Sequence, residues 1–533
     1  MHSRRRFLLR SGAAGAALVL APQAAIEALA APRLLRGGRF RQGVLSGDPT
    51  PRGITLLTIV DEAHGSGAVR VEVARDSGFN RVVARKTIST SAARGHSVKA
   101  RIEGLRPHER YWYRFETRDA HSPVGRFQTA LPEDSHEPVK FAFFSCAEYT
   151  HGFYNAYDLM RRDDVDFVVC LGDYIYSEAY HSIAGGTGVR DDAIGSENPA
   201  NPTIVREALT LDDYRAKYAL YRSDKALREL HARFPMVAVW DDHEVQDNYA
   251  GAAPGGGLDP TRRFSVERRR AATKAYFEAM PFFSQGASRV YRGERHGRTV
   301  DLIMLDQRQY RADQPCGDAV TPPCPDWNQP RPFLGRRQLD WLKRRLSASR
   351  ATWKVIGSQT MMMPARVTGG ALYQFDSWQG YPQEREELLE HIRARQIKDV
   401  VFITGDIHLF VAGDVRTAMG DGVPVAVEFV GGSVTSTNFG EMTIDAGGGI
   451  VIPGNDASPR TDPALVEVLR GLNPWVDQAD LDHHGYALVR ASRSTFDCTL
   501  RRLETIKRRS RALLPEQGFR YRVARGQTSI VGQ

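Results

Sequence analysis

The segment Asp166–Tyr176, DFVVCLGDYIY, constrains the fold of this chain more than any other stretch. Its short apolar run stops abruptly at Gly172, a pattern typical of a strand buried on both faces of a layered α/β sheet. Asp173 and Tyr176 follow in the loop beyond this strand, where open α/β sheets collect their ligands. The segment therefore predicts a carboxylate and a phenol close together at the carboxyl end of a buried strand.

Three further apolar runs end in the same way. The polar residues that follow them are Ser145-Cys146-Ala147-Glu148, then Trp240-Asp241-Asp242-His243-Glu244 with Asn248 beyond, and Gly405-Asp406-Ile407-His408. One such stop is equally typical of a helix cap or a turn. Four stops, each preceded by a strand, favour convergence, because a parallel sheet places the carboxyl ends of its strands along one edge.

The donor atoms of these stops suit more than one kind of cation. Carboxylate, amide and phenolate oxygens are hard donors for Ca²⁺, Mg²⁺, Mn²⁺ or ferric iron, whereas imidazole and thiolate suit iron or zinc. One cysteine and one tyrosine among several carboxylates do not match a structural zinc site, which takes four Cys or His ligands. We therefore predict a mixed site with one transition metal and one or more hard cations. Two metals that share a carboxylate can stabilise both the attacking and the leaving oxygen of an in-line displacement at phosphorus.

Residues 1–30 are predicted to be a twin-arginine export signal. Ser3-Arg4-Arg5-Arg6-Phe7 matches the twin-arginine pattern, a weakly apolar stretch follows, and Ala28-Leu29-Ala30 fits a small-x-small cleavage site. The alternative is an uncleaved anchor helix, although the Ala- and Gly-rich run is short for a bilayer and is interrupted by Pro22. We expect the twin-arginine machinery to export the protein, so that the mature chain is periplasmic or secreted and has no transmembrane segment.

Length and charge narrow the class of protein further. The 533 residues exceed what one hydrophobic core usually serves, so two domains are expected. The formal net charge of +9 is a mild excess that suits anionic ligands. No basic run with interleaved aromatic residues indicates nucleic-acid binding. The sequence does not indicate an oligomeric state.

The five cysteines have different predicted roles. Cys316 and Cys324 are eight residues apart in a Pro-rich segment, and in an oxidising compartment they are expected to close a loop by a disulfide. Cys170 and Cys498 are expected to be small apolar strand residues. Cys146 stands at a strand end instead, so it is a candidate metal ligand, with an inert buried thiol as the alternative.

The chain divides into a β-rich part and an α/β part. Residues 36–130 contain short alternating segments about ten residues apart, which predicts an immunoglobulin- or fibronectin-like β-sandwich. Residues 131–138 are the predicted linker, and strands and helices alternate in residues 138–533. The helices predicted there cover residues 154–162, 211–233, 263–280, 336–348 and 383–395. The strands predicted there cover residues 141–144, 166–171, 236–240, 301–305, 353–357 and 400–404, and the closing portion is more β-like.

Motifs occur in order along nearly the whole chain. They are GVLSGDPTP (Gly43–Pro51), SPVG (Ser122–Gly125), FSC, LGDYIY, WDDHEVQDN, LDQRQYR (Leu305–Arg311) and TGDIH. This set resembles the alkaline phosphatase D (PhoD-like) family of the metallophosphoesterases. The resemblance implies an α/β fold for residues 138–533, a four-layer metallophosphatase-like β-sheet sandwich flanked by helices, preceded by the small all-β domain.

The resemblance also implies roles for individual residues. Cys146, Tyr176 and His408 would bind ferric iron (Fe³⁺), Asp173 would bridge the metals, and Asp242, Asn248 and Asp406 would bind calcium (Ca²⁺), with other divalent metals left open. His243, beside Asp242, would face the phosphate as a hydrogen-bond donor or as general acid for the leaving oxygen. A metal-bound hydroxide would be the nucleophile, because cations lower the pKa of bound water.

One position departs from the family pattern. Some members carry an arginine directly after the bridging aspartate to grip phosphate, whereas this chain has Tyr174. A diester or a lipid head group can fit such a site better than the dianion of a monoester. Arg308 and Arg311 are candidate substitutes, and the alternative for both is a surface ion pair.

The sequence thus predicts a secreted metal-dependent enzyme that hydrolyses phosphomonoesters and whose substrates extend to phosphodiesters. A phospholipase D-like phosphodiesterase on the same scaffold is the alternative enzyme, with a lipid as substrate. The alternative from another class is a non-catalytic surface-binding protein whose metals are structural. The natural substrate, the pH optimum and the metal occupancy cannot be deduced from the sequence.

Overall fold

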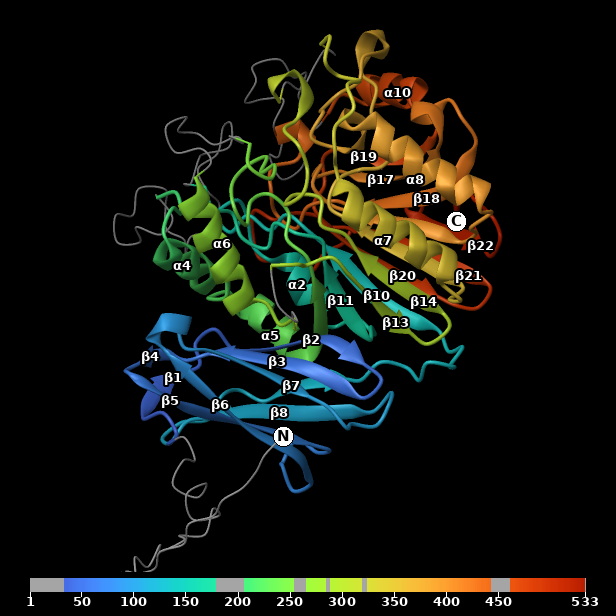
Figure 1. Cartoon of the computed structure of the whole chain (residues 1–533). Helices are drawn as coiled ribbons and strands as arrows, with labels where there is room; N and C mark the ends of the chain where they lie inside the picture. The colour runs from blue at the N-terminus through green and yellow to red at the C-terminus, as the bar shows by residue number, and fades with distance from the viewer. Residues whose placement is uncertain are drawn as a thin grey trace, which may run out of the picture.

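Two mixed β-sheets packed face to face form the centre of the molecule (Figure 1). The computed structural model describes residues 33–178, 206–253, 265–283, 288–318, 324–441 and 461–532. The predicted export signal, residues 1–30, lies outside these ranges. No helix within the described ranges combines the length and the apolar character that a membrane span requires.

The larger sheet has ten strands within the described residues, in the order β23-β22-β21-β20-β10-β11-β12-β2-β3-β7. The strands are β23 (Val531–Gly532), β22 (Arg520–Ala524), β21 (Thr495–Arg502), β20 (Gly485–Ala491), β10 (Val139–Phe144), β11 (Phe167–Cys170), β12 (Pro235–Ala238), β2 (Val44–Thr50), β3 (Gly53–Ile59) and β7 (Ser97–Ile102). Only the central neighbours β10, β11, β12 and β2 pair in parallel. Strand β11 is the buried strand predicted from the DFVVCLGDYIY segment.

The smaller sheet has seven strands in the described residues, in the order β13-β14-β15-β16-β18-β17-β19. They are β13 (Arg292–His296), β14 (Val300–Met304), β15 (Trp353–Ser358), β16 (Val400–Thr404), β18 (Pro424–Gly431), β17 (Phe410–Arg416) and β19 (Val476–Asp480). The pairs β14–β15, β15–β16 and β16–β18 are parallel. Strand β17 is a hairpin partner of β18 and follows directly after the TGDIH motif.

Helices cover the outer faces of both sheets, which gives four layers. A continuous apolar core that includes Phe143, Val169, Val355 and Ile403 joins the two sheets. The helices on the side of the larger sheet are α2 (Asn155–Met160), α4 (Leu211–Tyr221), α5 (Lys225–Arg233) and α6 (Val266–Ala279). Those on the side of the smaller sheet are α7 (Gly335–Ala348) and α8 (Pro382–Ala394), and α10 (Pro463–Leu472) packs beside β19. The predicted four-layer α/β class is confirmed.

The single helix predicted over residues 211–233 is wrong, because the structure divides it. Helix α4 begins with the predicted capping box, in which Thr210 and Asp213 bond each other's backbone N–H groups. It ends at Tyr221, and Asp224 then caps α5 by accepting from Leu227 N at 3.1 Å. An aspartate prefers this capping position to a helix interior, and the apolar pattern did not register the break.

The N-terminal part is an all-β sandwich, as predicted. One of its layers is the four-stranded sheet β6-β5-β8-β9, made of β6 (Val82–Ser91), β5 (Ser66–Ala74), β8 (Arg110–Glu116) and β9 (Gly125–Gln128). The other layer is β2-β3-β7, which is the end of the ten-stranded sheet. Strands β1 (Gly37–Arg39) and β4 (Asp61–Ala63) form a separate pair. The β2–β12 pairing thus continues one sheet from the sandwich into the α/β part.

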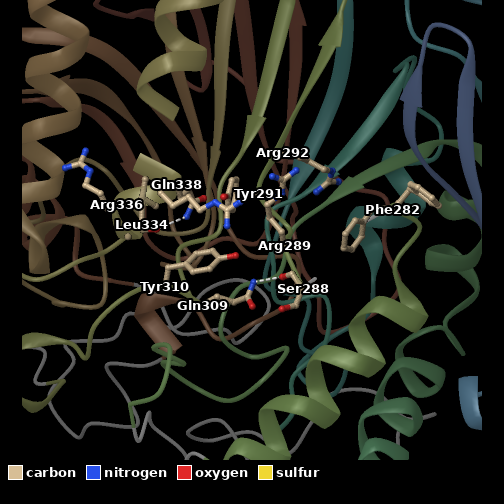
Figure 2. A pocket seen from close by; sticks show the side chains of 13 residues that line it. Phe282, Ser288, Arg289, Tyr291, Arg292, Gln309, Tyr310, Leu334, Arg336 and Gln338 are labelled. Atoms are coloured by element: carbon tan, nitrogen blue, oxygen red, sulfur yellow. Dashed lines mark hydrogen bonds between the residues drawn. The ribbon is translucent and has the colours of Figure 1, made fainter. Parts of the chain in front are cut away.

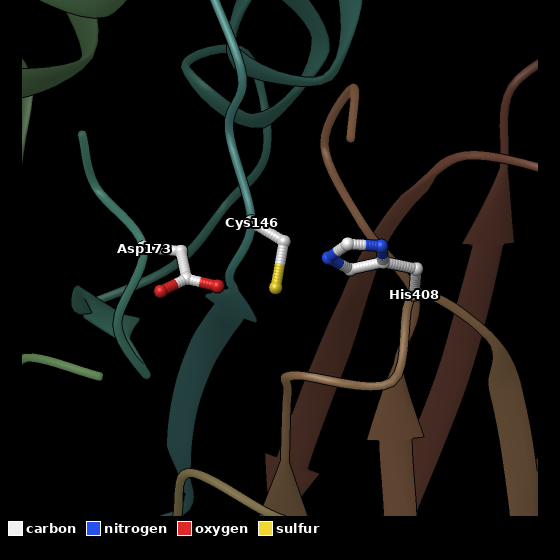
Figure 3. A group of neighbouring side chains, drawn as sticks. All are labelled: Cys146, Asp173 and His408. Atoms are coloured by element: carbon white, nitrogen blue, oxygen red, sulfur yellow. The ribbon is translucent and has the colours of Figure 1, made fainter. Parts of the chain in front are cut away.

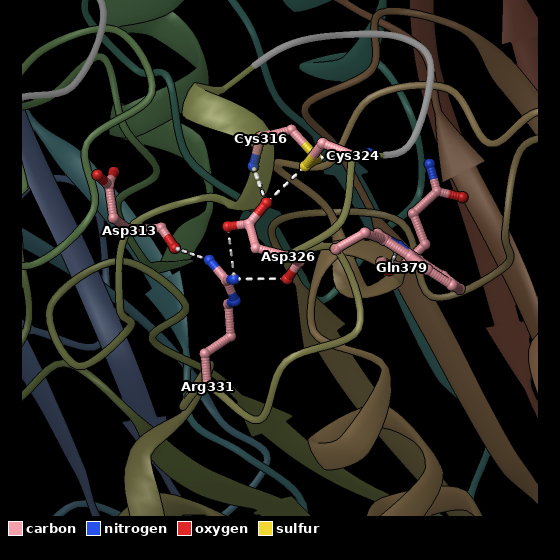
Figure 4. The surroundings of a disulfide bond; sticks show 7 residues. Asp313, Cys316, Cys324, Asp326, Arg331 and Gln379 are labelled. Atoms are coloured by element: carbon pink, nitrogen blue, oxygen red, sulfur yellow. Dashed lines mark hydrogen bonds and ion pairs between the residues drawn. A yellow bond between two sulfur atoms is a disulfide. The ribbon is translucent and has the colours of Figure 1, made fainter.

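Cys316 and Cys324 form the predicted disulfide. Figure 4 shows Asp326 beside it, where the carboxylate accepts a hydrogen bond from the backbone N–H of Cys316 at 3.3 Å and pairs with Arg331 at 3.0 Å. The other three cysteines are free and buried. Cys170 and Cys498 lie within β11 and β21 as apolar strand residues, as expected.

Candidate metal centre

The four strand stops converge, but from two sheets and not from the edge of one. The first three follow the adjacent parallel strands β10, β11 and β12, and the fourth follows β16 in the facing sheet. The expectation of one common edge is therefore wrong. The polar loops still meet, because the carboxyl ends of both parallel regions lie at the same end of the sandwich.

Several residues at these stops have a strained backbone conformation. Five residues predicted as metal ligands have a positive φ although they carry side chains: Cys146 (58°), Asp173 (52°), Asn248 (52°), Asp406 (65°) and His408 (58°). Each such conformation costs on the order of 1 kcal/mol or more and persists where surrounding structure enforces it. The folded chain therefore holds these side chains in place at a cost in stability, which is typical of a functional site.

Cys146, Asp173 and His408 form the first cluster. Their ligand atoms all lie within 4.8 Å of one another. Figure 3 shows the three side chains pointing toward one another from loops of separate chain segments. The hydroxyl of Tyr176 lies 3.4 Å from an Asp173 carboxylate oxygen and 3.3 Å from His408 Nε2, so the phenol joins the same cluster. One sulfur, one nitrogen and two kinds of oxygen thus meet at one point.

The imidazole of His408 has the orientation that a metal ligand requires. Its Nδ1 lies 2.7 Å from the backbone carbonyl of Thr437, which accepts a hydrogen bond from it and leaves Nε2 facing the cluster. Burial lowers the pKa of His408 to about 4, so the ring is neutral at physiological pH. Burial also raises the pKa of the Cys146 thiol, and a cation would be needed to hold it as thiolate.

A second cluster consists of carboxylates. One oxygen each of Asp241, Asp242 and Asp406 lies within 4.8 Å of the others, and Asp242 also meets Asp173 and His243 in this way. Asp173 thus belongs to the cysteine cluster and to a carboxylate cluster at once. Burial first, and then the charge of Asp242, raise the pKa of Asp173 well above its usual range.

The carboxylates carry more negative charge than the protein neutralises. Burial raises the pKa of Asp406 to about 7 despite the neighbouring Arg308. Oδ1 of Asp242 and Oδ2 of Asp406 are buried and have no hydrogen-bond partner in the described part of the chain. Buried carboxylate oxygens without a partner are costly, and oxygen-binding cations satisfy them. The residues present therefore fit a centre with a hard cation beside the cysteine cluster.

Asn248 is held on the carboxylate side by three contacts. Its backbone N–H donates to Asp242 Oδ2 at 2.7 Å, and its carbonyl accepts from Gln314 Nε2 at 3.0 Å. Its side-chain amide donates to Asp318 Oδ2 at 2.7 Å, which orients the amide oxygen. Asp318 lies in the loop that the Cys316–Cys324 disulfide closes.

His243 is positioned by a residue that the sequence analysis missed. Oε2 of Glu178 lies 2.8 Å from His243 Nδ1, and the ring of Tyr176 stacks on the imidazole with 4.0 Å between centroids. Burial acts to lower the pKa of His243, but the charges of Asp242 and Glu178 raise it well above its ordinary value. His243 is thus a protonated donor in the metal-free protein. Glu178 comes two residues after Tyr176, and that proximity was the available signal.

Glu244 has a structural role at the same place. Its carboxylate accepts hydrogen bonds from the backbone N–H groups of Asp173 (3.1 Å), Tyr174 (2.8 Å) and Asp241 (2.8 Å). One buried side chain thereby ties the loop after β11 to the loop after β12. This contact explains the glutamate that follows His243.

Neither arginine proposed as a substitute phosphate ligand is accessible. Arg308 is fully buried and forms ion pairs with Asp241, with Asp376 at 2.7 Å and with Asp406 at 3.1 Å. Arg311 is buried and pairs with Asp376 at 2.9 Å. Both arginines therefore form ion pairs inside the protein. The prediction that they bind phosphate and the alternative that they form ion pairs at the surface are both wrong. Asp376, which joins the two arginines, was not singled out by any motif.

Tyr174 points away from the cluster into the helical layer. Its hydroxyl lies 2.8 Å from His231 Nε2 and accepts a hydrogen bond from Arg222 Nε at 3.1 Å. Tyr174 is buried, and its hydroxyl is held by these two contacts away from the predicted metal ligands. His243 lines the cavity at the metal centre and remains the predicted phosphate contact.

A cavity of about 330 Å³ opens onto the centre. Its polar wall includes Asp173, Asp242, His243, Asn248, Asp406 and His408. The opposite wall is apolar and includes Ile407, Leu409, Phe439, Val466, Leu469 and Leu481. The structure therefore brings all predicted ligands together around one cavity, with Cys146 and Tyr176 behind its wall, while their binding of metal stays a prediction.

Comparisons with known sequences find similarity to phosphatases. The family model for PhoD-like phosphatase matches residues 141–500, and that for the PhoD-like phosphatase N-terminal domain matches residues 27–131. Alkaline phosphatase D of Bacillus subtilis (strain 168) is 36% identical over 460 residues, which cover 82% of this chain and 77% of the relative. Purple acid phosphatase 23 of Arabidopsis thaliana is 25% identical over 153 residues, which cover 28% of this chain and 31% of the relative.

Solved structures agree with the sequence comparisons. The structure of PhoD superposes with a TM-score of 0.81 and 31% identity, covering 93% of this chain and 92% of that one. The purple acid phosphatase PPD1 from yellow lupin seeds superposes with a TM-score of 0.52 at 11% identity, covering 88% of this chain and 71% of that one. The second likeness concerns the fold alone.

Proposed function

The chain belongs to the PhoD-like phosphatase family, and we propose that it is an exported hydrolase of phosphomonoesters that also accepts phosphodiesters. It is a metal-dependent phosphatase, which excludes the interpretation as a non-catalytic binding protein. The single observation that carries the proposal is Asp173, which belongs to the Cys146 cluster and also lies in a group with Asp242 and His243, so that it links the Cys146 cluster to Asp242 of the carboxylate cluster. A carboxylate shared in this way is the arrangement that two cations need to act on one phosphoryl group.

The two clusters suit different cations. Cys146, Tyr176 and His408, with Asp173, would hold ferric iron, because thiolate, phenolate and imidazole suit a transition metal. Asp242, Asn248 and Asp406, with Asp173 shared, would hold calcium through oxygen atoms alone. When bound, the cations would neutralise the phosphoryl oxygens and lower the pKa of the attacking water.

The protein's own residues complete the reaction. His243 would either donate a hydrogen bond from Nε2 to a phosphoryl oxygen or, as general acid, pass that proton to the leaving oxygen as the ester bond breaks. Glu178 holds the opposite nitrogen at 2.8 Å and thereby keeps the proton-bearing edge turned to the cavity. Buried Arg308 would hold Asp241 and Asp406 in place as the charge in the cavity changes.

A second candidate function is the cleavage of a phosphodiester at a lipid head group. The apolar wall of the cavity favours it, because Leu409, Phe439 and Leu469 offer a surface for an acyl or other apolar group. Tyr174 in place of an arginine also removes a contact suited to a monoester dianion. The shared chemistry of both candidates is hydrolysis of a phosphoester beside an apolar substituent.

Steady-state kinetics on three substrates tests the proposal. We expect the purified holoenzyme to hydrolyse 4-nitrophenyl phosphate faster than bis(4-nitrophenyl) phosphate, and both faster than phosphatidylcholine. Dominant turnover of phosphatidylcholine would favour the second candidate. His243→Ala should lower kcat about 100-fold or more on the preferred substrate. The control variant His64→Ala, at an exposed position in the sandwich, should be unaffected.

Two further measurements address export and metal identity. N-terminal sequencing of the secreted protein should begin directly after Ala30. Elemental analysis of the purified enzyme should find iron and calcium, and its visible spectrum should show a charge-transfer band from thiolate or phenolate to ferric iron. A colourless, iron-free and fully active enzyme would contradict the iron assignment.

A further inference from the structure

A second and larger cavity lies away from the candidate metal centre. Its volume is about 1180 Å³, and none of the predicted metal ligands lines it. Its wall is formed by residues of the segments 282–283 and 288–292, by Gln309 and Tyr310, and by Leu334 with the first turn of α7. Figure 2 shows Tyr310, Gln309 and Arg289 along this wall, with Gln309 Nε2 donating to the carbonyl of Ser288 at 2.6 Å.

The side chains of the LDQRQYR motif face two different parts of the protein. Arg308 and Arg311 are buried in ion pairs with the acids of the metal centre and its surroundings. Gln309 and Tyr310, which lie between the two arginines in the sequence, line the second cavity instead. The metal centre and its surroundings therefore explain the positions of Arg308 and Arg311, but not those of Gln309 and Tyr310.

The second cavity is lined by four arginines and by no aspartate or glutamate within the described residues. We call it the arginine cavity, after Arg289, Arg292, Arg336 and Arg337. Arg292 and Arg336 are each paired with two carboxylates at 2.6–3.2 Å. Arg289 and Arg337 are exposed and have no ion pair in the described part of the chain. Two guanidinium groups are thus available to an anion, and guanidinium matches the geometry of phosphate oxygens.

Aromatic rings lie beside these two arginines. Phe283 is 49% exposed and Tyr310 is 38% exposed, and both line the cavity. Tyr310 lies against Tyr291 with 5.8 Å between ring centroids, and the guanidinium of Arg289 lies 5.2 Å from the Tyr291 ring. A planar ligand group can pack against such exposed rings while its anionic group meets the guanidiniums.

We propose that the arginine cavity is a second binding site, separate from the metal centre, for an aromatic organic phosphate. Arg289 and Arg337 hold its phosphate group, and the exposed faces of Tyr310 and Phe283 pack against its ring. The site is separate from the hydrolytic reaction in this proposal, because none of the predicted metal ligands lines the cavity.

Calorimetric titration of the holoenzyme with phenylphosphonate tests this proposal. Phenylphosphonate carries a C–P bond, so phosphoester hydrolysis does not consume it. We expect two binding events per chain, one at the metal centre and one at the arginine cavity. In the double variant Arg289→Ala/Arg337→Ala the cavity event should weaken about 100-fold, because both charged hydrogen-bond donors are lost. The event at the metal centre should persist.

Matched variants separate a specific site from general charge effects. Arg344→Ala/Arg350→Ala removes the same charge from exposed positions that do not line the cavity, and should leave both events unchanged. Tyr310→Ala should weaken phenylphosphonate at the cavity but not methylphosphonate, which lacks the ring. Turnover of 4-nitrophenyl phosphate should be equal in the wild type and in Arg289→Ala/Arg337→Ala. A single binding event in the wild type, or a second event that this double variant leaves unchanged, would overturn the proposal.

Discussion

Replacing Glu178 with glutamine is expected to slow hydrolysis about 10- to 150-fold. Oε2 of Glu178 contacts His243 Nδ1 at 2.8 Å, and Oε1 accepts from the backbone N–H of Asp247 at 2.7 Å. Glutamine keeps the shape and one acceptor oxygen but loses the charge. A hydrogen bond to a charged group is worth about 1.5–3 kcal/mol. Since about 1.4 kcal/mol corresponds to a factor of ten, this loss sets the expected range.

The same substitution is expected to change the pH dependence of kcat. In the metal-free protein the charges of Asp242, Glu178 and Asp173 raise the pKa of His243 against the effect of burial. Removing one of these charges lowers that pKa. The protonated imidazole, which donates to the leaving oxygen, is then lost at a lower pH, so the basic limb of the profile should move toward acidic pH.

A double-mutant cycle decides whether Glu178 acts through His243. Turnover of 4-nitrophenyl phosphate is measured across the pH range for Glu178→Gln, His243→Ala and the double variant, with Glu267→Gln on the exposed surface of α6 as the control. The double variant should be no slower than His243→Ala, because both changes remove one function. An unchanged pH profile in Glu178→Gln, or effects that multiply in the double variant, would refute the reasoning.

Three further predictions concern the metals. Cys146→Ala should lose the charge-transfer band and bind substoichiometric iron by elemental analysis; a coloured, iron-replete variant would contradict the thiolate assignment. Asp318→Ala should weaken calcium binding about 10- to 100-fold in a calorimetric titration, because Asp318 orients the amide of Asn248 at 2.7 Å; an unchanged affinity would show that this contact is only structural. Calcium binding should release more protons at about pH 6 than at about pH 8.5, because the pKa of Asp406 is about 7 in the metal-free protein and the ligand must be ionised. The number of protons released is measured by calorimetry in buffers of different ionisation enthalpy. The same number at about pH 6 and at about pH 8.5 would contradict this account.

Local sequence patterns were sufficient for several parts of this protein. The apolar runs before Cys146, Asp173, Asp242 and Asp406 predict buried strands, because runs this short that end at turn residues are typical of strands buried on both faces. The eight-residue spacing of Cys316 and Cys324 predicts their disulfide, which the structure confirms. These inferences concern residues close together in the chain.

The remaining features depend on how distant segments meet. Periodicity does not show that β16 belongs to a different sheet from β10, β11 and β12, since a strand's neighbours leave no mark in its own pattern. It also does not show that Arg308 is buried among acids or that Glu178 holds His243. The contacts of Arg308 arise only when the two sheets pack and bring their loops to the same end of the sandwich. The contact of Glu178 with His243 arises when β11 and β12 pair side by side within the larger sheet. The sequence determined which residues stand at the strand ends, and the tertiary structure decided which of them face one another.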